Sequence, residues 1–143
     1  MTNMEAVRAW LRTYPPLKTG RLGVDFLPEQ AKSWSVYSVP GPENVKQYLD
    51  GSAVRQFDFI LASRFFSGDQ ITQNTDNLEW YEDFSAWVRQ QNQRPKHLPQ
   101  LSTGRTAQRV QVTTSGYPFQ MAENGMARYQ IQLKMTYYEK GTR

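Results

Sequence analysis

The feature that most constrains the fold is an alternating run near the C-terminus, residues 128–137. Successive side chains of a β-strand point to opposite faces of the sheet, so residues of one parity share a face. Here one parity is apolar or aromatic and the other is polar, whereas a helix would scatter the apolar residues around its circumference. The run therefore predicts a long strand of an antiparallel sheet, with one face covered and the other open. The inward residues are Tyr129, Ile131, Leu133, Met135 and Tyr137.

The polar face of this strand has two interpretations. It carries no acidic residue between Arg128 and Thr136. An exposed polar strand face is common, so the first interpretation is a solvated surface. The second is a partner surface formed by Gln amides together with the cations of Arg128 and Lys134.

Length and composition restrict the class of protein. A chain of 143 residues predicts a single domain over 1–143. Hydrophobic residues make up 38%, which argues against a disordered chain, and no apolar run reaches the roughly 20 residues of a membrane span. No secretory signal is recognisable at the N-terminus. The absence of Cys excludes disulfides, zinc–thiolate sites and Cys nucleophiles, and suits assembly in a reducing cytoplasm.

Two helices are predicted from apolar residues at helical spacing. The first covers 3–14, capped by Asn3 and stopped by the pair of prolines that follows. The second and longer covers 75–92, capped by Asn74 or Thr75, with its acidic residues in the N-terminal half, where the helix dipole favours them. Its buried stripe consists of Trp80, Tyr81, Phe84, Trp87 and Val88.

Further strands are predicted from alternation and aromatic content. Residues 22–27 and 34–39 form a pair around a turn at 28–30, and 53–66 forms a second long strand. The inward residues are Val24, Phe26, Trp34 and Val36 in the pair, and Phe57, Phe59, Leu61 and Phe65 in the long strand.

The remaining segments complete the predicted fold. A short helix is expected at 43–49, a basic, Pro-containing connection at 93–106, a strand at 109–114 and a loop of about ten residues at 115–125. The fold class is therefore α+β. It comprises a mainly antiparallel sheet of four to five strands with two helices packed on one face.

Charge is unevenly distributed along the chain. The net charge of +4 divides into +2 over residues 1–64, −4 over 65–92 and +6 over 93–143. An acidic middle and a basic end can steer head-to-tail contacts between copies of one protein.

The residues available for catalysis are few. The single histidine, His97, lies in a Pro-containing segment, and the motifs GxSxG and HExxH and a phosphate-binding Gly loop are absent. Carboxylates on the long helix are better explained as a solvated face that the helix dipole favours. We therefore expect a protein that is not an enzyme, with no catalytic, cofactor-binding or metal-binding residues.

The pI of about 9.4 makes nucleic-acid binding an alternative function. RNA-binding sheets expose aromatic residues beside basic ones. Here Asp58 stands between Phe57 and Phe59, and the RNP1 pattern is missing. Specific nucleic-acid binding is not expected, although the basic C-terminal third leaves weak phosphate attraction open.

Most of the chain resembles a family of small virion proteins, the minor capsid or tail terminator proteins of long-tailed phages and prophages of Gram-positive bacteria. The residues that carry the likeness are Trp10 in a short helix, 34–39 (WSVYSV), 46–52 (KQYLDGS) leading into 55–59 (RQFDF), 77–87 with its Phe-x-x-Trp spacing, 98–101 (LPQL) and 127–137 (ARYQIQLKMTY). These are structural residues without a catalytic motif.

The resemblance implies a role and partners. Such a protein forms a six-fold ring at the head-proximal end of the virion tail, stops polymerisation of the tail tube protein and offers a surface to head-completion proteins. DNA would pass through the lumen with passive contact only. The alternatives are a head–tail connector of the neck and, from another class, a basic nucleic-acid-binding module.

A closed ring is a heterologous interface, so each copy must present two different patches. We expect the acidic side of the long helix to meet the basic connection and the 115–125 loop of a neighbour, together with the cations of the last strand. The predicted interface residues are Glu79, Glu82, Asp83, Arg94, Lys96, Arg105, Tyr117, Phe119, Arg128 and Lys134.

Overall fold

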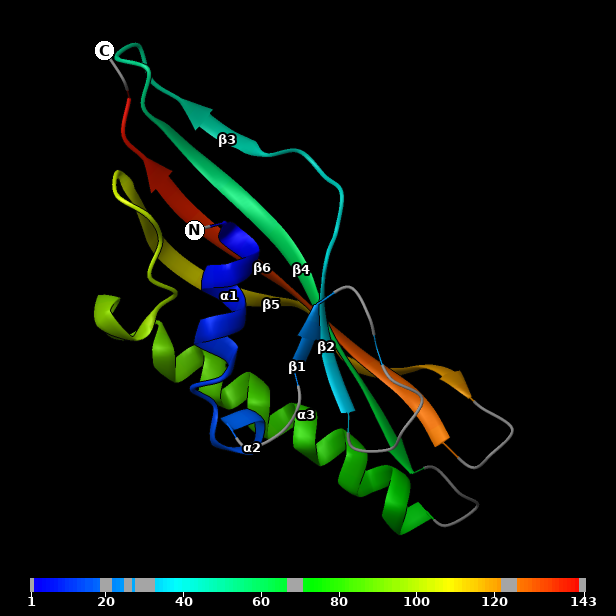
Figure 1. Cartoon of the computed structure of the whole chain (residues 1–143). Coiled ribbons are helices and arrows are strands. Elements are labelled where there is room, and N and C mark those ends of the chain that lie inside the picture. The colour runs from blue at the N-terminus through cyan, green and yellow to red at the C-terminus, as the bar shows by residue number, and fades with distance from the viewer. Residues whose placement is uncertain are drawn as a thin grey trace.

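The computed structural model of the chain places three α-helices on one face of a six-stranded sheet (Figure 1). It describes the backbone of residues 2–18, 22–24, 27, 33–66, 71–121 and 126–141, without the side chains of 65–66, 71–76, 119–121 and 126–127.

The sheet is mostly antiparallel, with strand order β1-β2-β4-β6-β5 and β3 also paired to β4. This confirms the predicted α+β class, with six strands and three helices among the described residues in place of four to five and two. The elements are α1 (Asn3–Leu11), α2 (Pro15–Lys18), β1 (Leu22–Val24), β2 (Ser33–Ser38), β3 (Asn44–Gln47), β4 (Ala53–Phe66), α3 (Ile71–Gln91), the 3-10 helix η1 (Pro95–His97), β5 (Arg105–Met121) and β6 (Met126–Glu139).

The two predicted long strands form the centre of the sheet. β4 and β6 pair in continuous antiparallel register from Ala53 opposite Glu139 to Phe66 opposite Met126. Phe59 lies opposite Leu133 in this register, and both side chains are buried. All five residues predicted to point inward from β6 are at most 3% exposed, which confirms the alternation. On β4, Phe57 is half-buried, and the side chain of Phe65 lies outside the described residues.

Helix α3 covers this apolar face. Tyr81, Phe84 and Val88 are buried, while Trp80 and Trp87 are half-buried and pack against the core. Tyr14, in the turn between α1 and α2, contacts α3 above the sheet, with the Tyr14 and Phe84 ring centroids 5.3 Å apart. Aromatic rings at such distances add to the stabilisation from area burial alone. The predicted stripe is therefore the core of the domain.

Both predicted helix caps were wrong, although the first helix begins at Asn3 as predicted. The hydroxyl of Thr2, rather than Asn3, caps α1 by accepting a hydrogen bond from the Glu5 amide at 3.1 Å. Helix α3 begins at Ile71, so Asn74 and Thr75 lie inside it. Several polar residues near a helix start can act as caps, and the sequence alone does not select among them.

The first strand pair differs from its prediction. β1 covers only Leu22–Val24 and runs parallel to β2, with Leu22 opposite Trp34. Val24 shares the face of the buried Leu22 and pairs with the buried Val36, so it points inward as predicted, but on the outer strand it remains 40% exposed. Phe26 and the predicted turn at 28–30 lie outside the described residues.

The helix predicted at 43–49 is absent. β3 occupies Asn44–Gln47 and pairs antiparallel with the N-terminal end of β4, with Gln47 opposite Ala53. A short segment that is exposed along its length follows whichever partner satisfies its backbone, and here that partner is the free edge of β4.

The loop predicted at 115–125 is mostly strand. β5 runs from Arg105 to Met121 and follows β6 through four register shifts. Each bulge inserts extra residues and interrupts the alternation of side chains. The periodicity of the sequence therefore did not reveal the full length of the strand. The basic connection predicted at 93–106 is also shorter, because β5 already begins at Arg105.

Tyr81 gives the core a pH-dependent element. Its hydroxyl lies 2.5 Å from the Ser63 hydroxyl and donates to the Tyr129 carbonyl oxygen at 3.3 Å. Burial raises the pKa of this phenol above its ordinary 10.0, against a smaller lowering effect from the Ser63 hydrogen bond. The folded chain therefore retains a proton that the unfolded chain releases above pH 10.

We predict that Tyr81→Phe flattens the alkaline dependence of stability. For the wild type, the contribution of Tyr81 is complete below pH 10 and is lost as the pH rises toward the folded-state pKa. The variant lacks this loss, although at neutral pH it is less stable by about 1–2 kcal/mol because the Ser63 hydroxyl loses its partner. Urea unfolding at several pH values on both sides of 10 measures both effects. Equal alkaline slopes for the two proteins would contradict the prediction.

Candidate interaction surfaces

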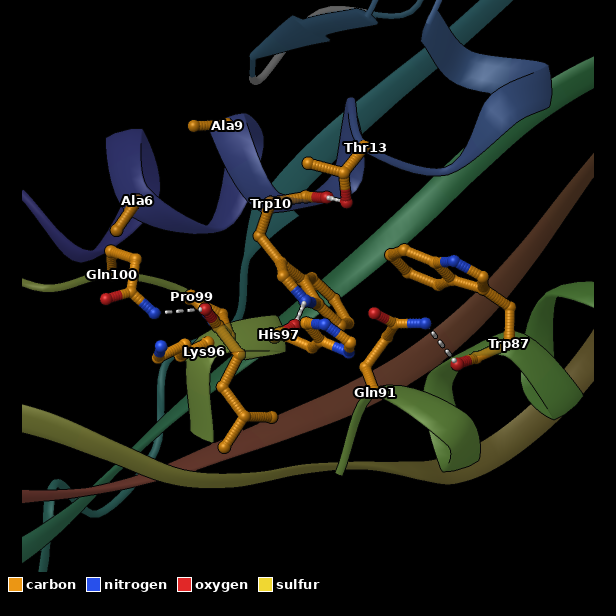
Figure 2. Close-up of a pocket in the computed structure, with 11 residues that line it drawn as sticks. Ala6, Ala9, Trp10, Thr13, Trp87, Gln91, Lys96, His97, Pro99 and Gln100 are labelled. Atoms are coloured by element: carbon orange, nitrogen blue, oxygen red, sulfur yellow. Dashed lines mark hydrogen bonds between the residues drawn. The ribbon is translucent and has the colours of Figure 1, made fainter. Parts of the chain in front are cut away.

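An apolar groove lies between α1, the C-terminal end of α3 and the segment that follows it (Figure 2). It encloses about 400 Å³. Figure 2 shows the indoles of Trp10 and Trp87, with the side chains of Gln91 and His97 next to them. The two indole centroids are 4.9 Å apart at a tilt of 40°. The groove is lined by residues of the two helices together with residues 96–100.

Hydrogen bonds fix the walls of the groove. The Trp10 indole Nε1 donates to the His97 carbonyl oxygen at 2.8 Å, which ties α1 to η1. Gln91 Nε2 donates to the Trp87 carbonyl oxygen at 3.2 Å. Lys96 and His97 line the groove and are exposed. The groove is therefore preformed, apolar inside and basic at one rim.

This arrangement favours binding over chemistry. A volume of about 300–1,000 Å³ is typical of ligand pockets. The polar side chains that line the groove form no pair of nucleophile and base, and His97 accepts the Trp10 hydrogen bond through its main-chain oxygen rather than its ring. Among the described residues, no three His, Cys, Asp or Glu side chains lie close enough together to hold a metal ion. An apolar group of another molecule is the occupant that such walls accept.

A second surface carries the predicted acidic patch. Glu79, Glu82 and Asp83 are all exposed on α3. Arg94 and Lys96 are exposed just beyond the end of that helix at Gln91, which lies about 18 Å along the axis from Glu79. The acidic residues on α3 and the basic residues beyond its C-terminal end are therefore exposed at separate places on the surface.

The face of the sheet opposite the helices is a third surface, and it is less solvated than its polar sequence suggests. Gln130 and Thr136 are buried. The Tyr117 hydroxyl from β5 accepts hydrogen bonds from the amides of Gln130 at 2.7 Å and Gln132 at 3.5 Å. Neighbouring strands therefore cover part of this face with their own side chains.

The cations of this third surface are also in contact with other groups. The Arg128 guanidinium lies 5.0 Å from the Tyr37 ring centroid, a cation–π distance. Lys134 is half-buried opposite Asp58, beside a shallow hollow of about 200 Å³. These positions of the two cations are compatible with either interpretation of this face made from the sequence.

The other predicted interface residues lie apart from these. Arg105 is half-buried at the start of β5, 5.7 Å from the Tyr137 ring centroid, and donates to the Ser102 hydroxyl at 3.1 Å. The side chain of Phe119 lies outside the described residues. The ten predicted residues therefore do not form one patch.

Two features were missed from the sequence. The first is the groove beside Trp10 and Trp87. Each of these residues belongs to an apolar stripe at helical spacing, which predicted core packing and gave no sign of a groove. The second is Leu49, which is 100% exposed in the turn between β3 and β4, although the prediction placed it in a helix. An apolar residue beside Asp50-Gly51 was the available signal for an exposed turn.

Comparisons with known proteins do not identify a family for this chain. No helix within the described ranges combines the length and the apolarity needed to cross a membrane. A scan against protein-family models and a search of curated proteins both found no match to this chain.

Proposed function

We propose that this chain is a structural virion protein, a tail terminator that caps the head-proximal end of a phage tail tube as a ring. The ring, a hexamer by resemblance, stops polymerisation of the tube protein and offers a docking surface to head-completion proteins. The sequence resemblance motivates the proposal. The α+β architecture with helices on one face of the sheet agrees with the fold that the resemblance implies.

The observation that carries the proposal is the separation of opposite charges on the surface. A closed ring requires two different and complementary patches on each copy. Exposed Glu79, Glu82 and Asp83 supply one, and exposed Arg94 and Lys96 supply the other. Complementary patches of this kind steer association and fix register.

The test is deletion of the gene from the phage or prophage that carries it, with tail lengths measured by negative-stain electron microscopy. Loss of a terminator leaves the tube protein free to polymerise, so we expect abnormally long tubes without heads. Complementation with the wild-type gene should restore normal lengths. A copy carrying E79K, E82K and D83K should fail to restore them, because like charges would then face one another in the ring.

The other outcomes separate the alternatives. Tails of normal length beside unattached full heads would assign the chain to a head–tail connector. Normal infectious particles would remove both virion roles. The nucleic-acid-binding alternative predicts DNA binding that weakens steeply with added salt, which filter binding at several salt concentrations measures.

A further inference from the structure

The turn between β3 and β4 presents the most exposed large apolar residue in the described part of the chain. Leu49 is 100% exposed, and its neighbour Tyr48 is 40% exposed. Val45 on β3 adds a further 56% exposed side chain. Isolated surface Leu residues are ordinary, but a cluster at the projecting end of a hairpin is typical of an interaction site.

This turn, residues 48–52, is a well-formed structure. The Tyr48 amide donates to the Ser52 carbonyl oxygen at 2.8 Å, and the Gly51 amide to the Tyr48 carbonyl oxygen at 3.1 Å. The Asp50 carboxylate accepts from the amide of Ser52 at 2.9 Å and from its hydroxyl at 2.5 Å. Gly51 adopts φ 87°, which only glycine does without strain. Leu49 is therefore held outward on a rigid support.

The Trp10–Trp87 groove is a complementary surface on the same molecule. It shares no residue with the turn, and at about 400 Å³ it has room for apolar side chains. Its rim carries the exposed cation of Lys96, whereas the turn carries the Asp50 carboxylate next to Leu49. Two hydrogen bonds from Ser52 lower the pKa of Asp50 below its ordinary 3.8, and a carboxylate of this pKa is charged at neutral pH. The two surfaces are thus both apolar and carry opposite charges beside the apolar groups.

We infer that Leu49 in the β3–β4 turn of one copy inserts into the Trp10–Trp87 groove of a second copy, with Asp50 facing Lys96. The contact joins two different patches, so it propagates head to tail and closes only as a ring. In naming the contact between ring subunits, the inference rests on the proposed function. Leu49 is the anchor of a larger interface, since stable interfaces bury about 1,200 Å² or more.

A cysteine cross-link tests the contact directly, because the chain has no native Cys. Leu49→Cys protein is mixed with Gln91→Cys protein, whose substituted side chain lines the groove (Figure 2). Mild oxidation should produce a dimer containing one copy of each variant, identified by mass spectrometry. The control replaces Leu49→Cys by Val24→Cys, an exposed apolar position on β1, and should give only background cross-linking.

A second measurement uses assembly. Leu49→Asp should weaken self-association by roughly ten- to a hundredfold, as expected when one Leu side chain no longer becomes buried. Val24→Asp should leave association unchanged. Analytical ultracentrifugation over a concentration series measures both, and circular dichroism checks that each variant is folded.

The outcomes distinguish this contact from the proposed function. A Leu49–Gln91 cross-link at the Val24 background level, or equal association of Leu49→Asp and wild type, would overturn the docking. Overgrown tails in the gene deletion together with either result would retain the terminator role and reject only this interface. A specific cross-link with normal tails in the deletion would retain the docking and reject the terminator role.

Discussion

Phe84→Ala is expected to lower the free energy of unfolding by about 3–5 kcal/mol, the range for truncating a fully buried Phe. Phe84 is 0% exposed at the middle of α3. Its ring centroid lies 5.3 Å from that of Tyr14, 5.8 Å from Trp80 and 5.9 Å from Trp87. Removing the Phe84 ring leaves a cavity that the three neighbouring rings, which are rigid, cannot fill. The substitution also removes the edge and stacking contacts of Phe84 with those rings.

The loss at Phe84 is large against the 5–15 kcal/mol that a domain of this kind has in total. Urea unfolding monitored by tryptophan fluorescence and by circular dichroism measures it. The matched control is Leu78→Ala on the same helix, where the side chain is 40% exposed and the change should cost about 1 kcal/mol or less. Equal losses at the two positions would show that Phe84 is not the centre of the core.

Gly116→Ala is expected to destabilise the fold by about 2–3 kcal/mol, because β5 passes too close to α3 to admit a side chain. A Cβ atom at Gly116 would lie 2.4 Å from Tyr81 Cβ and 2.5 Å from Tyr81 Cγ. Neither atom belongs to a flexible chain end, so the strand or the helix itself must shift. Gly116 lies where β5 changes register against β6, between Thr114 and Tyr117, and the bulge brings the strand toward the helix.

The matched control for Gly116 is Ser115→Ala, the exposed neighbour on the same strand. It should change the free energy of unfolding by no more than about 0.5 kcal/mol. Thermal unfolding of both variants by calorimetry gives the comparison. Unchanged stability in Gly116→Ala would mean that β5 can move away from α3 without cost.

Much of the core could be predicted from the sequence because periodicity reports burial. Tyr129 to Tyr137 alternate and are buried at every second position, as predicted. The buried positions on α3 follow from the 3.6-residue period in the same way. The local backbone geometry decides which residues share a face of a strand or helix. The hydrophobic effect then favours burial of the apolar face, whichever element packs against it.

Segments without strong periodicity could not be assigned from the sequence. β3 is exposed along its length, and its conformation comes from the edge of β4 that it pairs with. β5 contains bulges that interrupt its alternation, so only its central part was recognised as strand. The parallel pairing of β1 likewise depends on where the sheet places its outer strand.

The sequence by itself determined the class of fold, the buried faces of β4, β6 and α3, and the acidic and basic divisions of the chain. Only the tertiary structure decided which surfaces lie open for a partner. The Trp10–Trp87 groove needs two helices and η1 to meet, and the outward position of Leu49 needs β3 to pair with β4. Local patterns report which residues avoid water, whereas a groove or a projecting tip depends on distances between segments far apart in the chain.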